Sequence, residues 1–300
     1  MRKFRGKYPI IAGILVMVVM ILAMLLASVG LSVLLRVMPW LGQLGEYALQ
    51  LPVELAMLLV MAGMAVLLGM QGIFTCRGRG FLKSLIPAAV LLVIYALAGV
   101  ENLILSIGSP MRSFAAFFVF LLCMAAVGIT EEITFRGLIA GMIYDKYGAT
   151  PAGVWLSVIA SSLIFGMVHI TNAVGDEAAL SGVLIQMAGA SAMGMCLAAV
   201  YFRGRNIWAV AAVHGFMDCC ALLDSGLFYE GSMIDTIGGY TAASLVAYGF
   251  YVIVALVLLR PGCMKMITSS PISGKGETVK LGIVVGLLGA MVGAVIVWTV

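Results

Sequence analysis

The chain has 300 residues, of which 63% are hydrophobic and only 10% are charged, and its mean hydropathy is +1.17. Soluble domains carry about 25% charged residues, so this composition excludes an ordinary soluble protein and predicts an integral membrane protein in a lipid bilayer. The net charge of +4 comes from basic residues spread over short loops, and it gives no reason to expect a nucleic-acid partner.

Apolar segments long enough to cross a bilayer, about 20 residues each, recur along the chain. They predict an all-α, polytopic transmembrane bundle of about eight or nine spans, at 10–35, 52–74, 84–106, 114–144, 152–171, 180–202, 206–223, 240–259 and 281–299. The fourth segment exceeds one bilayer thickness, so we expect it to tilt, bend or project. We divide this single membrane domain into N-terminal helices (1–110), core helices (111–225) and C-terminal helices (226–300).

The distribution of lysine and arginine predicts the orientation. With the N-terminus inside, most basic residues fall on the cytoplasmic side, before the first helix and in alternate loops. The opposite loops hold only Arg36 and Arg112, and they are rich in acidic residues. Short loops are typical of a bacterial membrane protein. We therefore expect a bacterial cell-membrane protein with a cytoplasmic N-terminus.

Several ionisable residues fall inside the predicted spans, where a charge at the bilayer centre costs about 2.5–3.5 kcal/mol on insertion scales. They are Glu131, Glu132 and Arg136 in the fourth segment, His169 in the fifth, and His214 and Asp218 in the seventh. The two histidines of the chain both belong to this group. Such residues predict a functional site inside the membrane.

Helical geometry separates the two glutamates. Glu132 and Arg136 are four residues apart on one helix face, so they can pair. Glu131 is turned about 100° away from Glu132, which leaves it free to face a cavity. We assign Glu132 and Arg136 to structure and Glu131 to chemistry. In the alternative interpretation, all three form one buried ion network.

The expected helix lengths also allow the histidines to reach Glu131. Around the tight turn at 148–151, His169 is level with the glutamate pair. His214 lies roughly 15 Å above the turn at 203–206, and Glu131 lies roughly 21 Å from its own turn, at 1.5 Å per residue. Tilt can absorb this difference of one helical turn. We therefore predict that Glu131, His169 and His214 converge on one cavity.

A glutamate with two histidines is suited to activating water. The same residues form a two-histidine, one-glutamate set of zinc ligands that leaves a fourth position for water. Asp218, four residues after His214, could orient that imidazole or serve as a further ligand. The motifs HExxH and GxSxG are absent. A metal-free mechanism stays open, but we expect zinc, held by Glu131, His169 and His214, and an activity that depends on it.

At these positions the sequence resembles the CAAX-protease and bacteriocin-processing family of intramembrane metalloproteases. That family carries EExxxR, FxxxH and HxxxN, or a similar polar residue, on successive core helices. Here the motifs are Glu131-Glu132-x-x-x-Arg136, Phe165-x-x-x-His169 and His214-x-x-x-Asp218. Order and spacing agree over roughly residues 110–225.

The resemblance implies roles for these residues. Glu131 would activate water with help from His214, while His169 and residue 218 would stabilise the developing oxyanion. Asp218 departs from the usual asparagine, and a carboxylate cannot donate to an oxyanion unless it is protonated. This favours metal binding or orientation of His214. Glu132, Arg136 and Phe165 would support the site.

The predicted activity is therefore hydrolysis of a peptide bond in a membrane-associated peptide or protein tail. A non-catalytic scaffold or bacteriocin-immunity protein is the main alternative, but degenerate motifs would accompany it and these motifs are intact. A transporter using intramembrane Glu and His is the second alternative. Internal repeats with broken helices would indicate a transporter, and the sequence has no evident repeat.

Overall fold

The computed structural model describes residues 1–75, 80–173, 180–229, 232, 235–236 and 239–268. Regular structure in these residues is helical, apart from one isolated bridge between Met111 and Phe228. The predicted all-α membrane fold is confirmed for this part of the chain. The span expected at 281–299 lies outside the described residues.

The helices follow the predicted segments with shifted ends. In chain order they are α1 (Arg2–Lys7), α2 (Pro9–Val37), η1 (Pro39–Gln43), α3 (Glu46–Leu67), η2 (Gln71–Thr75), α4 (Phe81–Leu85), η3 (Ile86–Ala88), α5 (Ala89–Leu105), α6 (Phe114–Glu132), η4 (Ile133–Ala140), α7 (Gly141–Tyr147), α8 (Pro151–Val168), η5 (His169–Ala173), α9 (Leu180–Gly204), α10 (Ile207–Ala221), α11 (Leu223–Leu227), α13 (Ser244–Leu258) and α14 (Pro261–Thr268).

Within the described residues, 6 helical segments are long and apolar enough to cross a membrane, or 7 if the pair α13 and α14, bent by 64°, is counted as one span. Helix α10 has 15 residues and is shorter than the span predicted at 206–223. It packs against α5, α6 and α9, and most of its apolar side chains are buried, with Trp208 and Phe216 as exceptions.

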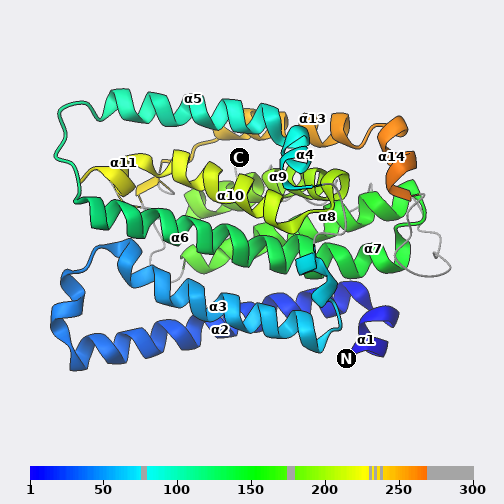
Figure 1. Cartoon of the computed structure of the whole chain (residues 1–300), viewed down its shortest axis with the longest axis horizontal. Helices are drawn as coiled ribbons and strands as arrows, with labels where there is room; N and C mark the ends of the chain where they lie inside the picture. The colour runs from blue at the N-terminus through cyan, green and yellow to red at the C-terminus, as the bar shows by residue number, and fades with distance from the viewer. Residues whose placement is uncertain (76–79, 174–179, 230–231, 233–234, 237–238, 269–300) are drawn as a thin grey trace.

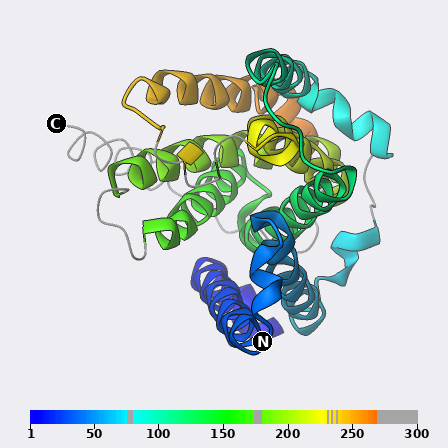
Figure 2. The ribbon, with the colours of Figure 1, turned by 90° about the vertical axis from the view of Figure 1, so that its left-hand side faces the viewer.

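The long helices run side by side along the longest axis of the molecule (Figure 1). Helices α2 and α3 lie on one side of the bundle, α5 and α13 lie on the opposite side, and α8, α9 and α10 lie between them (Figure 2). The outer helices expose large apolar side chains such as Leu26, Leu59 and Leu105, each more than 70% exposed. Such surfaces suit lipid, whereas α8 and α9 are mostly buried.

The long fourth segment is continuous and locally distorted. Helix α6 passes into a π-helical stretch, η4, and then into α7, giving a segment of 34 residues. A turn follows, in which the Thr150 side chain accepts a hydrogen bond from the Gly153 amide and Pro151 occupies the first turn of α8. This is a common way to start a helix. The distortion begins directly after Glu132.

Helices α6 and α10 approach until their main chains touch. A Cβ added at Gly128 would lie 2.7 Å from the Gly215 amide nitrogen and 2.8 Å from the Ala211 carbonyl oxygen. A Cβ added at Gly215 would lie 2.9 Å from the Met124 carbonyl oxygen. Only glycine fits such a contact, as at other close crossings of membrane helices. The crossing brings the end of α6 next to the middle of α10.

Basic residues from distant parts of the chain meet at one end of the bundle. Arg5 of α1 forms a 2.9 Å ion pair with Asp145 of α7, and the Lys146 ammonium donates to the Lys7 carbonyl oxygen. The Arg205 guanidinium donates to the Tyr144 hydroxyl. The residues expected on the cytoplasmic side therefore share one end of the fold. Which side of the membrane this end faces stays a prediction.

Candidate active site

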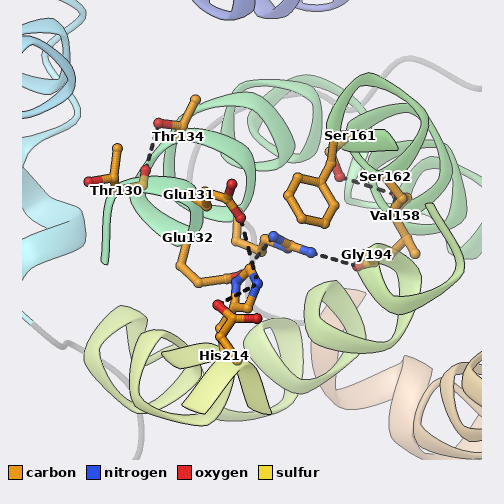
Figure 3. A network of polar contacts seen from close by, with 12 residues as sticks. Thr130, Glu131, Glu132, Thr134, Val158, Ser161, Ser162, Gly194 and His214 are labelled. Carbon is orange, nitrogen blue, oxygen red and sulfur yellow. Dashed lines mark hydrogen bonds and ion pairs between the residues drawn. The ribbon is translucent and has the colours of Figure 1, made fainter. Parts of the chain in front are cut away.

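The Glu132 carboxylate, fully buried at the end of α6, binds two groups through one oxygen. Arg136 Nη1 donates to Glu132 Oε1 at 2.6 Å, and His214 Nδ1 lies 2.7 Å from the same oxygen. Because a carboxylate oxygen accepts, this contact places a proton on His214 Nδ1. All three side chains are at least 98% buried. Figure 3 shows both glutamates reaching from α6 towards the His214 ring.

The other nitrogen of His214 faces two more carboxylates. Its Nε2 atom lies 3.6 Å from Glu131 Oε2 and 3.7 Å from Asp218 Oδ2. Both acidic side chains are partly open, with exposed fractions of 19% for Glu131 and 24% for Asp218. The imidazole therefore has one side locked by a buried carboxylate and one side turned to open carboxylates.

The Phe165 ring joins the remaining groups. The Arg136 guanidinium lies over its face, 4.6 Å from the ring centre, in a cation–π contact. The rings of His169 and His214 meet it edge-on, with centres 5.1 and 5.9 Å away. His169 Nδ1 lies 3.1 Å from the Phe165 carbonyl oxygen, so Nδ1 carries the donated proton. Phe165 thus sets the spacing between the two histidines.

Glu131, His169, His214 and Asp218 all line one cavity with a volume of about 520 Å³. This volume is in the usual range for ligand pockets. Methionines from α2, α3 and α6 (Met20, Met57, Met124) form apolar wall, as does Met193 of α9. Tyr95 of α5 and Tyr251 of α13 also line it, and their hydroxyls are hydrogen-bonded to each other.

The structure brings together every site residue expected from the sequence and rearranges two of them. We expected Asp218 to orient His214 or to serve as a further ligand, but the Glu132 carboxylate contacts the imidazole Nδ1, and Asp218 lies 3.7 Å from Nε2, beyond hydrogen-bonding distance. Glu132 therefore does more than pair with Arg136, because it also contacts His214, and these three side chains form a buried polar network. Glu131 stands at its edge and opens to the cavity. The chemical roles of these residues stay predictions.

Sequence reasoning missed Glu54 of α3, which is 7% exposed and lines the same cavity. The signal was available, because Glu54 is a charged residue inside an apolar segment and follows the same insertion rule as the residues that were found. The π-helical stretch after Glu132 was also missed. Such distortions often accompany functional sites, but they carry no clear sequence pattern.

The expected zinc ligands do not form a metal-binding group. Among the described residues, no set of three His, Cys, Asp or Glu side chains converges closely enough to hold an ion. His214 Nε2 approaches Glu131 and Asp218 separately, and the Nδ1 atom of His169 is directed at a main-chain carbonyl. The zinc expectation stays a prediction that this donor geometry does not support.

Comparison with known families agrees with the motifs. Residues 113–220 match the family model described as Type II CAAX prenyl endopeptidase Rce1-like, and all three motifs fall inside this range. No curated protein and no solved structure matches the chain significantly. The family match confirms the resemblance inferred from the motifs. It supports an intramembrane protease of the CAAX type in general terms.

Proposed function

We propose that the chain is an intramembrane endopeptidase that hydrolyses a peptide bond in a membrane-associated peptide or protein tail. One observation carries this proposal: His214 Nε2 and Glu131 Oε2 lie 3.6 Å apart at the wall of a cavity, with the opposite face of His214 locked by Glu132. Two acceptors at this separation can both hydrogen-bond one water at about 2.8 Å.

The fixed tautomer of His214 determines how that water is held. With Nδ1 donating to Glu132, Nε2 of the neutral imidazole carries a lone pair and accepts. The ionised Glu131 carboxylate also accepts. The water donates one proton to each, so its oxygen directs lone pairs towards a substrate carbonyl in the cavity. This arrangement raises the nucleophilicity of the water, and no covalent bond forms between the enzyme and the substrate.

The proton transfers follow from the same contacts. The water oxygen attacks the carbonyl carbon while Glu131 takes one proton. When the tetrahedral intermediate collapses and the C–N bond breaks, Glu131 returns that proton to the leaving nitrogen. His214 holds the second proton as an imidazolium next to Glu132, and it releases this proton when the carboxylate product leaves. General acid–base catalysis of this kind typically contributes about 10²–10⁴-fold.

Stabilisation of the oxyanion sets conditions on two residues. With Nδ1–H donated to the Phe165 carbonyl oxygen, neutral His169 presents Nε2 as an acceptor. It therefore donates to an oxyanion only as an imidazolium. Asp218 donates only when its carboxyl is protonated. We assign this role to His169, whose ring lies edge-on to Phe165 beside the cavity.

The experiment compares purified wild-type protein with Glu131→Gln in lipid nanodiscs, using lipidated and unlipidated peptides as substrates. Hydrolysis in H₂¹⁸O should place ¹⁸O in the new carboxyl terminus. Glu131→Gln keeps the side-chain shape and should lower turnover by at least about 10²-fold, whereas Glu101→Gln, an exposed glutamate of α5, should not. Wild-type turnover by Glu131→Gln would refute the mechanism.

A further inference from the structure

Glu54 also lines this cavity and takes no part in the mechanism above. It belongs to α3, which packs against α6, and it is only 7% exposed. Its Oε2 atom has no hydrogen-bond partner among the described residues. Its Oε1 atom receives one long hydrogen bond, 3.4 Å, from Gln50 Nε2.

An unpaired buried carboxylate is costly, and proteins usually pair it or use it. A second glutamate on α3, Glu46, lies outside the cavity lining. Glu54 is therefore a carboxyl group whose free oxygen is available to something that enters the cavity, and a bound cation would favour its ionised form.

The charges around the cavity favour a cation. Three carboxylates line it, from Glu54, Glu131 and Asp218, and no lysine or arginine is among its described lining residues. Arg136, which lies behind the wall, is already neutralised by Glu132. Attraction between opposite charges is much stronger in such a poorly solvated site than in water. Apart from the two histidines, a positive group of a ligand would meet no cationic side chain among the described lining residues.

Part of the cavity wall is apolar and adaptable. Met20, Met57 and Met124 line it from three helices, and methionine side chains fit varied shapes. Methylene groups pack well against such a wall while a charged end reaches a carboxylate. The combination suits an alkylammonium or guanidinium group on a flexible stem.

We propose that Glu54 binds a positively charged group of the substrate peptide, either a lysine or arginine side chain or a free amino terminus, and thereby determines specificity. This inference rests on the proposed peptidase function. Substrates with a cation close to the scissile bond should be cleaved in preference to neutral isosteres, because Glu54 shares the cavity with Glu131 and His214.

The test uses one peptide series that carries lysine, norleucine or glutamate at each position flanking the cleavage site, with free and acetylated amino termini. On wild-type protein we expect kcat/KM for the best lysine or free-amine peptide to exceed that of its neutral counterpart by about tenfold or more. The flanking-residue peptides and the peptides with free or acetylated amino termini show whether a side chain or the amino terminus supplies the bound positive charge. In Glu54→Gln this ratio should fall close to one, while the control Glu101→Gln should keep it.

Thermal stabilisation of the wild-type protein by the same peptides is measured in parallel. Cleavage without any preference for a cation, or a preference that survives in Glu54→Gln, overturns the inference and leaves the peptidase proposal standing. Stabilisation by cationic peptides without cleavage, abolished in Glu54→Gln, supports the inference and refutes the peptidase. If Glu54→Gln does not fold, Glu54→Asp keeps the charge and should keep the preference for cationic peptides. A wild-type protein without this preference overturns the proposal in any case.

Discussion

Replacing Glu132 by alanine is expected to destabilise the protein and to slow catalysis, because this carboxylate holds two buried groups. Arg136, which is 1% exposed, would lose its 2.6 Å ion pair. His214 would lose the acceptor of its Nδ1 proton. Removing one partner of a buried ion pair costs about 3–5 kcal/mol, and a buried donor left unsatisfied costs about 1–3 kcal/mol. These costs overlap, so we expect a loss of about 3–5 kcal/mol.

Two variants separate stability from catalysis at this position. Glu132→Gln keeps a carbonyl oxygen for the His214 Nδ1 proton but removes the charge opposite Arg136. It should be destabilised and should retain more activity per folded molecule than Glu132→Ala. In the alanine variant the imidazole loses its orientation, and turnover should fall by about 10- to 100-fold, as when a histidine loses its supporting carboxylate.

The assay is thermal unfolding in detergent together with peptide turnover normalised to folded protein. Glu101→Ala, at an exposed position on α5, is the matched control and should melt with the wild type. A wild-type melting temperature for Glu132→Ala would refute the reasoning. If Glu131→Ala were the unstable variant instead, our division of roles between the two glutamates would be reversed.

Three further predictions concern the same site. Glu131→Ala should fold and insert normally but lose peptidase activity, as measured by melting temperature and turnover. Gly128→Ala places a methyl group 2.7 Å from the Gly215 nitrogen, so it should lower both the melting temperature and turnover, whereas Gly63→Ala, which has open space around it, should change neither. Activity should survive treatment with a membrane-permeant chelator and verified metal removal, because no three His, Cys, Asp or Glu side chains of the described residues converge. A loss of activity that stoichiometric zinc restores would instead support the zinc-bound water expected from the sequence.

The membrane fold and the core of the site could be predicted because both follow from transfer free energies. Hydropathy finds apolar helices, and the cost of a charge in hydrocarbon identifies Glu131, His169 and His214. The short helix α10 shows where this argument ends. Hydropathy cannot separate a helix covered by protein from one covered by lipid, so a full span was expected where the structure has 15 residues.

The partner of each nitrogen of His214 was not predictable. Glu131, Glu132 and Asp218 all carry carboxylates that the sequence places within about one helical turn of His214. Their spacing alone does not show which of them contacts which nitrogen of that ring. The choice depends on the π-helical stretch after Glu132 and on the glycine contact between α6 and α10, both of which are properties of the main chain. The family resemblance supplied roles for these residues but no hydrogen-bond partners.

The glycine contact between α6 and α10 has a consequence for how such a protein can change over time. Since main-chain atoms of Gly128 and Gly215 fix the distance between the two helices, the reacting pair does not depend on the bulk of the cavity wall. Methionines and tyrosines on the other helices can then be exchanged one at a time without moving Glu131 relative to His214. New substrates would become accessible by mutation at the wall, while the proposed hydrolytic chemistry would be inherited unchanged.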